Sequence, residues 1–181
     1  SARVTKRLRI VVLADLQFDA WGAHEQRAID LAAAENPDLV VFPGDFVQKY
    51  GAERRAVLEK ARDALEASAL RPPLGSYAVE GNIEVGGWEA MFPPRMTTLV
   101  SGEAEREGVR VTGLSLGESF RRDLRISRRD ERFHVVVGHA PDFSLGEVDA
   151  DLLVAGHTHG GQVQLPLIGP LVTFSAGSRT V

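Results

Sequence analysis

The chain has 181 residues, of which 44% are hydrophobic and 25% charged, and its formal net charge is −4. These values are ordinary for a globular domain with a substantial core, and they argue against a protein that coats nucleic acid. The absence of cysteine excludes disulfides, thiolate nucleophiles and Cys-ligated zinc. No apolar run approaches the ~20 residues of a membrane span. The chain opens on Ser1 without an initiator Met, which is compatible with a true N-terminus that lies upstream, including a removed signal or anchor.

The first half of the chain alternates apolar runs with amphipathic segments. We expect buried strands over 8–14, 39–42 and 76–79, and helices over 22–35 and 52–70. Alternation of strand and helix predicts parallel pairing with right-handed crossovers.

The second half is richer in strands. We expect them over 97–100, 109–116, 134–137, 152–155, 162–165 and 171–175. Only the charged segment 121–132 among them is typical of a helix or a long loop. This order fits two sheets packed face to face, with helices outside, better than one open sheet. Since no repeat or linker interrupts it, we predict one α/β domain over residues 1–181.

Polar residues of a particular kind follow the predicted strands, where ligands gather in α/β folds. They are Asp15, Gln17, Asp45, Asn82, His139, His157 and His159. Taken alone, the two aspartates would be helix caps, but beside three histidines ligation is the better interpretation. Carboxylates, amide oxygens and imidazoles suit Mn, Fe, Co, Ni or Zn better than calcium. Asp45 has two oxygens to bridge two ions ~3.5–4 Å apart, which would clamp a phosphoryl group and polarise a water.

These residues occur in five ordered motifs. The motifs are Asp15-Leu16-Gln17, Gly44-Asp45, Gly81-Asn82-Ile83-Glu84, Gly138-His139 and Gly156-His157-Thr158-His159. Together they resemble the calcineurin-like metallophosphoesterase family. The longer stretch 155–166 resembles a bacterial branch that includes membrane-associated phosphoesterases and lipid A precursor hydrolases. The resemblance implies an αββα sandwich of two mixed sheets with flanking helices.

The resemblance also implies a dinuclear centre and a reaction. Asp15, Gln17, Asp45 and His159 would surround a first divalent ion, and Asp45, Asn82, His139 and His157 a second, with Asp45, Asn82 and His139 counted as catalytic. The ions would be Mn, Fe, Zn, Co or Ni, and a metal-bound hydroxide would attack a phosphate ester. Nucleotides and phospholipid precursors are both compatible substrates. We expect the protein in the cytoplasm or at the periphery of the membrane.

Two residues depart from the family pattern. Gln17 stands where the family has a histidine ligand, and a neutral amide is a poorer donor, so we expect a weaker first site. Ile83 replaces the histidine that assists the leaving group, a contribution typically worth ~10²–10⁴-fold. A phosphodiesterase is therefore favoured over a monoesterase. The alternative is a weak or inactive scaffold, or a module that binds a phosphorylated ligand, in which the fold is kept without catalysis.

Three further features each have two interpretations. Trp21 and Trp88 are expected in the core, and the alternative is an apolar rim for the substrate. Glu84 is expected to orient a ligand, and the alternative is a substitute acid. The arginines of 121–132 are expected on a solvated face with local ion pairs, and the alternative is a patch for anionic lipid head groups.

Overall fold

The computed structural model describes residues 7–159, 164–165 and 169–170. The helices are α1 (Ala23–Ala34), α2 (Arg54–Ala67) and α3 (Leu116–Ser119), with 3₁₀ turns η1 (Trp88–Met91) and η2 (Pro141–Leu145). The strands are β1 (Ile10–Val12), β2 (Leu39–Phe42), β3 (Ser76–Ala78), β4 (Thr97–Thr98), β5 (Gly102–Arg106), β6 (Val109–Gly113), β7 (Arg125–Ile126), β8 (Phe133–Val137), β9 (Glu147–Val148), β10 (Leu152–Val154), β11 (Gln164–Leu165) and β12 (Gly169–Pro170). The predicted strand 171–175 lies outside the described residues. None of the helices in the described part is long and apolar enough to cross a membrane.

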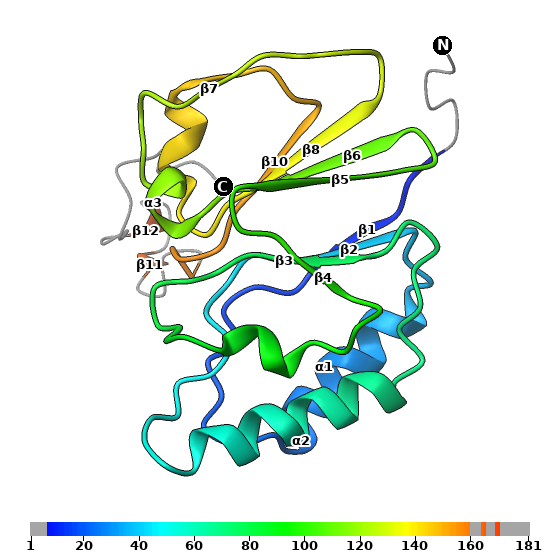
Figure 1. Ribbon diagram of the computed structural model, residues 1–181, viewed down its shortest axis with the longest axis vertical. Coiled ribbons are helices and arrows are strands. Elements are labelled where there is room, and N and C mark those ends of the chain that lie inside the picture. The colour runs from blue at the N-terminus through cyan, green and yellow to red at the C-terminus, as the bar shows by residue number, and fades with distance from the viewer. Residues whose placement is uncertain (1–6, 160–163, 166–168, 171–181) are drawn as a thin grey trace.

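Two four-stranded sheets form the centre of the molecule. The first has the order β1-β2-β3-β4, and all of its pairings are parallel. The second has the order β10-β8-β6-β5, in which β10, β8 and β6 are parallel and β5 is antiparallel to β6. Figure 1 shows the sheets as two layers, with α1 and α2 on the outer side of the first sheet. The predicted two-sheet α/β sandwich is therefore confirmed.

The space between the sheets is filled by aliphatic side chains. The buried members of this core are Leu39, Val41, Leu74, Tyr77, Val79, Leu99, Val109, Val111, Val135, Val137 and Val154. On β6, Val109 and Val111 belong to this core, whereas the intervening Arg110 lies on the outer face, as the two-residue period of a strand requires. The continuous apolar run of β2 is buried along its whole length, because the sheet is covered on both faces.

A second core lies between the first sheet and its helices. Leu58, Ala61 and Leu65 of α2 form the buried stripe expected of an amphipathic helix. Trp21 and Trp88 are 5% and 2% exposed and belong to this core. They therefore pack as core residues, and the rim interpretation is not supported.

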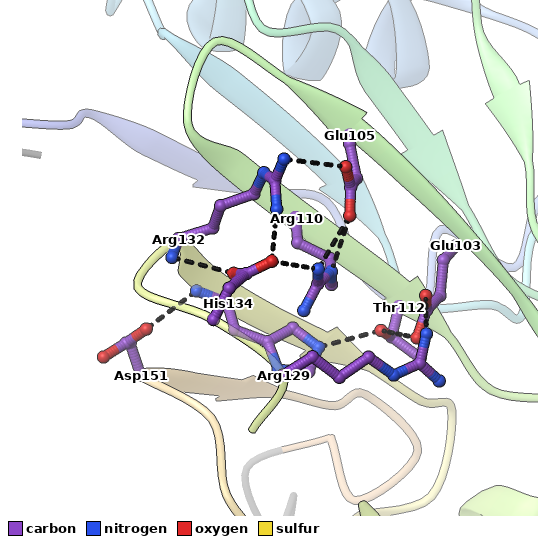
Figure 2. Close-up of polar contacts among 9 residues, drawn as sticks. Glu103, Glu105, Arg110, Thr112, Arg129, Arg132, His134 and Asp151 are labelled. Carbon is purple, nitrogen blue, oxygen red and sulfur yellow. Dashed lines mark hydrogen bonds and ion pairs between the residues drawn. The ribbon is translucent and has the colours of Figure 1, made fainter. Parts of the chain in front are cut away.

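The arginine-rich segment 121–132 is a loop that contains β7, and the structure, which describes all twelve of its residues, has no helix there. It runs along the outer face of the second sheet and is bound to distant carboxylates. Arg129 pairs with Glu103 at 2.9 Å (Figure 2). Arg128 pairs with Asp151 at 3.1 Å. The ion-pair interpretation therefore fits. Some pairs are local, such as Arg121 with Asp123 at 3.0 Å, whereas others join the loop to residues more than twenty positions away along the chain.

Beneath this loop lies a polar network centred on the buried residues Arg110, Thr112 and His134 (Figure 2). Arg110 is 5% exposed and binds Glu105 at 2.8 Å and Asp130 at 2.6 Å. The Nε2 atom of His134 lies 2.8 Å from the Thr112 hydroxyl. Burial and then the positive charge of Arg110 lower the pKa of His134 from its ordinary value, so the imidazole favours its neutral form.

Candidate metal centre

The seven predicted ligands all lie in loops that follow strands of the two sheets, and the structure brings all seven side chains together around Asp45, His139 and His159. The shared neighbour is Asp45, which is 2% exposed. One group consists of Asp45, His139 and His157, and another of Asp15, Asp45 and His159, with the ligand atoms of each group within 4.8 Å of one another. We call these the His139 group and the His159 group. Asp45 belongs to both, which is the arrangement that a bridging carboxylate requires.

Within the first sheet, the loops after β1 and β2 run side by side. The Asp15 amide donates to the Gly44 carbonyl at 3.2 Å, and the Gln17 amide donates to the Asp45 carbonyl at 3.0 Å. These bonds continue the parallel pairing of the strands beyond their ends. As a result, the first two motifs are held next to each other by their backbones.

Among the hydrogen bonds that join the loops of one sheet to those of the other, two involve backbone atoms. The Nδ1 atom of His139, from the second sheet, lies 2.8 Å from the Pro43 carbonyl of the first. The His157 amide donates to Asp15 Oδ1 at 3.0 Å. The centre therefore lies where the two sheets meet.

Five of the seven predicted ligands adopt left-handed backbone conformations. The φ angles are 53° at Asp15, 43° at Gln17, 59° at Asp45, 69° at His157 and 50° at His159. Such a conformation costs a non-glycine residue about 1–3 kcal/mol and persists only where neighbouring contacts enforce it. Strain of this kind concentrates at functional sites. Here the left-handed backbone conformation directs side chains of these loops toward one cluster.

Two glycines allow the loops to approach this closely. A Cβ atom on Gly81 would lie 2.2 Å from the Asp45 nitrogen and 2.3 Å from Asp45 Oδ1. A Cβ atom on Gly44 would lie 2.6 Å from the Gly81 Cα and 2.8 Å from His139 Nδ1. The glycines of the Gly-Asp and Gly-Asn motifs are therefore explained by backbone contact around Asp45.

Glu84 fastens the same two loops together. Its Oε2 accepts from the backbone amides of Asp45 at 2.8 Å and Gly81 at 2.7 Å, and its Oε1 accepts from Phe46 at 2.6 Å. Burial raises the pKa of Glu84 and outweighs the opposing effect of the three amide donors. The carboxylate is engaged with backbone on both sides, which supports its interpretation as an orienting residue.

Acceptor atoms converge on one nitrogen of His139. The Pro43 carbonyl can only accept, so it fixes the proton of the neutral imidazole on Nδ1 and leaves a lone pair on Nε2. That Nε2 lies 2.7 Å from Asn82 Oδ1, 3.3 Å from Asp45 Oδ1 and 3.1 Å from His157 Nδ1. Two oxygens that only accept and a lone pair repel one another at these distances, unless a proton or a cation lies among them. The His139 group therefore fits a divalent ion in the chemistry of its donors.

The His159 group is arranged differently. The Gln17 amide nitrogen lies 3.2 Å from Asp45 Oδ2 and 3.1 Å from His159 Nε2. The side chain thus presents its nitrogen to these two residues, whereas an amide would ligate a metal through its oxygen.

Two apolar residues adjoin the centre. The Ile83 amide donates to Asp45 Oδ1 at 3.1 Å, so the residue that departs from the family pattern lies beside the bridging carboxylate. Phe120, which is 41% exposed, packs edge-on against His157 with ring centroids 5.3 Å apart. Sequence reasoning missed Phe120, because it follows α3 and belongs to none of the motifs.

A sequence model of the family described as calcineurin-like phosphoesterase matches residues 8–161. The chain belongs to this family. It is 29% identical over 185 aligned residues to the uncharacterized metallophosphoesterase YkuE of Bacillus subtilis (strain 168), an alignment that covers 91% of the chain. It is 26% identical to the uncharacterized metallophosphoesterase YkoQ of the same strain, with 89% of the chain covered. The chain spans 63% and 64% of the lengths of these relatives. Calcineurin-like phosphoesterases use metal ions, and the two carboxylate–histidine groups are suited to hold them.

Proposed function

We propose that the chain is a divalent-metal-dependent hydrolase of phosphate esters that prefers diesters to monoesters. The observation that carries this proposal is the convergence of Asn82 and Asp45 oxygens on the lone pair of His139. Such a cluster is costly unless a proton or a cation lies among these atoms, and a divalent ion matches the mixture of oxygen and nitrogen donors.

The residues that would hold metal follow from the two groups. One ion would be bound by Asp45, Asn82, His139 and His157, and a second by Asp15, Asp45 and His159. Gln17 would join the second set only after its side chain turns away from Asp45 and His159 and presents its oxygen. When bound, divalent ions supply Lewis-acid polarisation of a phosphoryl group and activation of a water as nucleophile. Mn, Fe, Zn, Co and Ni all suit this mixture of oxygen and nitrogen donors.

The protein positions the metal-binding side chains, but at position 83 it has no general acid to assist the leaving group. Pro43 orients the His139 ring, and the Ile83 amide fixes one Asp45 oxygen. The Ile83 side chain has no proton to give a departing alkoxide, which removes a contribution of ~10²–10⁴-fold. Esters with good leaving groups should therefore react best, and nucleotides and phospholipid precursors with a diester linkage are the favoured substrate classes.

Turnover of aryl phosphates tests the proposal. Protein reconstituted with manganese should hydrolyse a bis-aryl phosphate faster than the mono-aryl ester. Asp45→Asn and His157→Ala should each reduce the rate by roughly 10²-fold or more. Asp19→Asn and His24→Ala change exposed residues outside the motifs and serve as matched controls. Absence of turnover with every one of the five metals, or equal rates in Asp45→Asn and Asp19→Asn, would refute the enzymatic function.

A second candidate function is a scaffold that keeps the family fold without catalysis. Two observations favour it: the Gln17 amide nitrogen faces Asp45 and His159, and Ile83 lies beside Asp45. Ile83→His separates the two functions, because an enzyme that lacks only its general acid should gain rate on esters with poor leaving groups. A scaffold should gain nothing.

A further inference from the structure

The amide nitrogen of Gln17 lies between two ligand atoms of the His159 group, Asp45 Oδ2 and His159 Nε2. We propose that the Gln17 amide substitutes for a cation between Asp45 and His159, so that the two groups load unequally. The His139 group takes one ion tightly, and the His159 group takes a second only when Gln17 swings away. This inference rests on the proposed metal-dependent function and specifies its stoichiometry.

The orientation of the Gln17 amide follows from its neighbours. Asp45 Oδ2 is a carboxylate oxygen and can only accept, so the atom that lies 3.2 Å from it must be the NH₂ nitrogen. The second hydrogen of that NH₂ points to His159 Nε2 at 3.1 Å, which accordingly presents its lone pair. One NH₂ group thus engages two lone pairs that a metal ion in the His159 group would need.

The backbone of Gln17 holds the side chain in this place. Its amide donates to the Asp45 carbonyl at 3.0 Å, and its φ of 43° is one of the left-handed values of the centre. The residue is therefore tied to the loop that carries Asp45. Removing the amide from the group requires a side-chain rotation rather than a displacement of the loop.

The His139 group has the opposite character. Asn82 Oδ1 and Asp45 Oδ1 are acceptors that face His139 Nε2, and a divalent ion that displaces any proton there would be bound by all three atoms. In the His159 group, by contrast, the amide hydrogens already supply positive partial charge between Asp45 and His159. A second ion must break both hydrogen bonds, one of them to a carboxylate, which should weaken its binding by roughly 10²-fold relative to the first.

Metal titration of the full chain tests this asymmetry. Metal-free protein should be titrated with Mn²⁺ by calorimetry, and the manganese retained after desalting should be measured by elemental analysis. Electron paramagnetic resonance gives an independent readout, because two Mn²⁺ ions ~3.5–4 Å apart are magnetically coupled and an isolated ion is not. The natural chain should retain about one ion, with the spectrum of an isolated ion and a second affinity roughly 10²-fold weaker.

Two substitutions at position 17 sharpen the test. Gln17→His should bind two ions with affinities within about tenfold of each other and show the coupled spectrum, since imidazole is a metal ligand. Gln17→Ala removes the competing NH₂ and should strengthen the second ion without adding a ligand. Gln48→Ala, a change at an exposed glutamine outside the motifs, should behave like the natural chain.

The outcomes also separate this inference from the proposed function. Two ions of equal affinity in the natural chain, or an unchanged stoichiometry in Gln17→His, would overturn the inference. One tight ion without turnover of any aryl phosphate would support the inference and refute the enzymatic function. No bound ion in the natural chain would overturn both. The titration of the natural chain decides the matter even where a variant fails to fold.

Discussion

Replacing Glu84 by glutamine should destabilise the protein by about 2–4 kcal/mol. The carboxylate accepts from three backbone amides, two at Oε2 from Asp45 and Gly81 and one at Oε1 from Phe46. A glutamine oxygen keeps the first two bonds in weaker, uncharged form, which costs about 1 kcal/mol each. Its NH₂ then faces the Phe46 amide, and a buried donor without a partner costs about 1–3 kcal/mol. These costs sum to about 3–5 kcal/mol, and because glutamine is less costly to bury than a carboxylate, the net loss falls to about 2–4 kcal/mol.

Urea unfolding of metal-free protein measures this loss. Trp21 and Trp88 are buried in the core beside the first sheet, so their fluorescence reports the transition. Glu89→Gln is the matched control, since Glu89 is exposed and the change in charge is the same. The expected loss is a large part of the total free energy of unfolding of a domain, which is typically about 5–15 kcal/mol, but the variant should remain folded. Ordinary surface substitutions change the free energy of unfolding by no more than about 0.5 kcal/mol. If the unfolding free energies of Glu84→Gln and Glu89→Gln differ by less than this, Glu84 does not fasten the two loops.

Two further predictions concern the centre and the buried network. Gly81→Ala should lower both the affinity for Mn²⁺ and the melting temperature, because the new Cβ would lie 2.2 Å from the Asp45 nitrogen. Calorimetry measures the affinity and thermal unfolding the melting temperature, and no change in either would contradict this close contact. His134 has a lowered pKa, so the unfolded chain takes up its proton more readily, and stability should fall as the pH drops below about 6.5, the ordinary value for histidine. In His134→Gln, the free energy of unfolding should therefore change less with pH between about pH 7 and 5 than it does in the natural chain. Urea titration with a chelator present measures this slope, and an identical slope in both proteins would exclude the effect.

The elements that the sequence predicts best are those whose composition agrees with their burial. β2 forms over the predicted residues 39–42, and α1 lies within one residue of its predicted bounds. β5 was not predicted, since Gly102–Arg106 is mostly polar and lacks apolar alternation. Its pairing with β6 is an edge pairing, in which one strand supplies the burial and the other mainly backbone hydrogen bonds.

For the centre, the motifs predicted which residues come together but not how they are held. Parallel strands end at one edge of a sheet, so the clustering of Asp15 with Asp45 follows from topology. The left-handed conformations of these residues could not be foreseen, because Asp and His, although enriched among non-glycine residues at positive φ, adopt such values in only a small minority of positions. The orientation of the Gln17 amide depends on tertiary contacts with Asp45 and His159, which no pattern along the chain encodes.

The meeting of the two sheets at His139–Pro43 and His157–Asp15 has a thermodynamic consequence. A ligand bound by residues of both sheets stabilises the folded state against unfolding. The gain is about 2.7 kcal/mol when the ligand concentration is a hundred times its dissociation constant. A chelating buffer would then act on this protein as a mild denaturant, and cation supply would govern how long the folded chain survives heat or proteases.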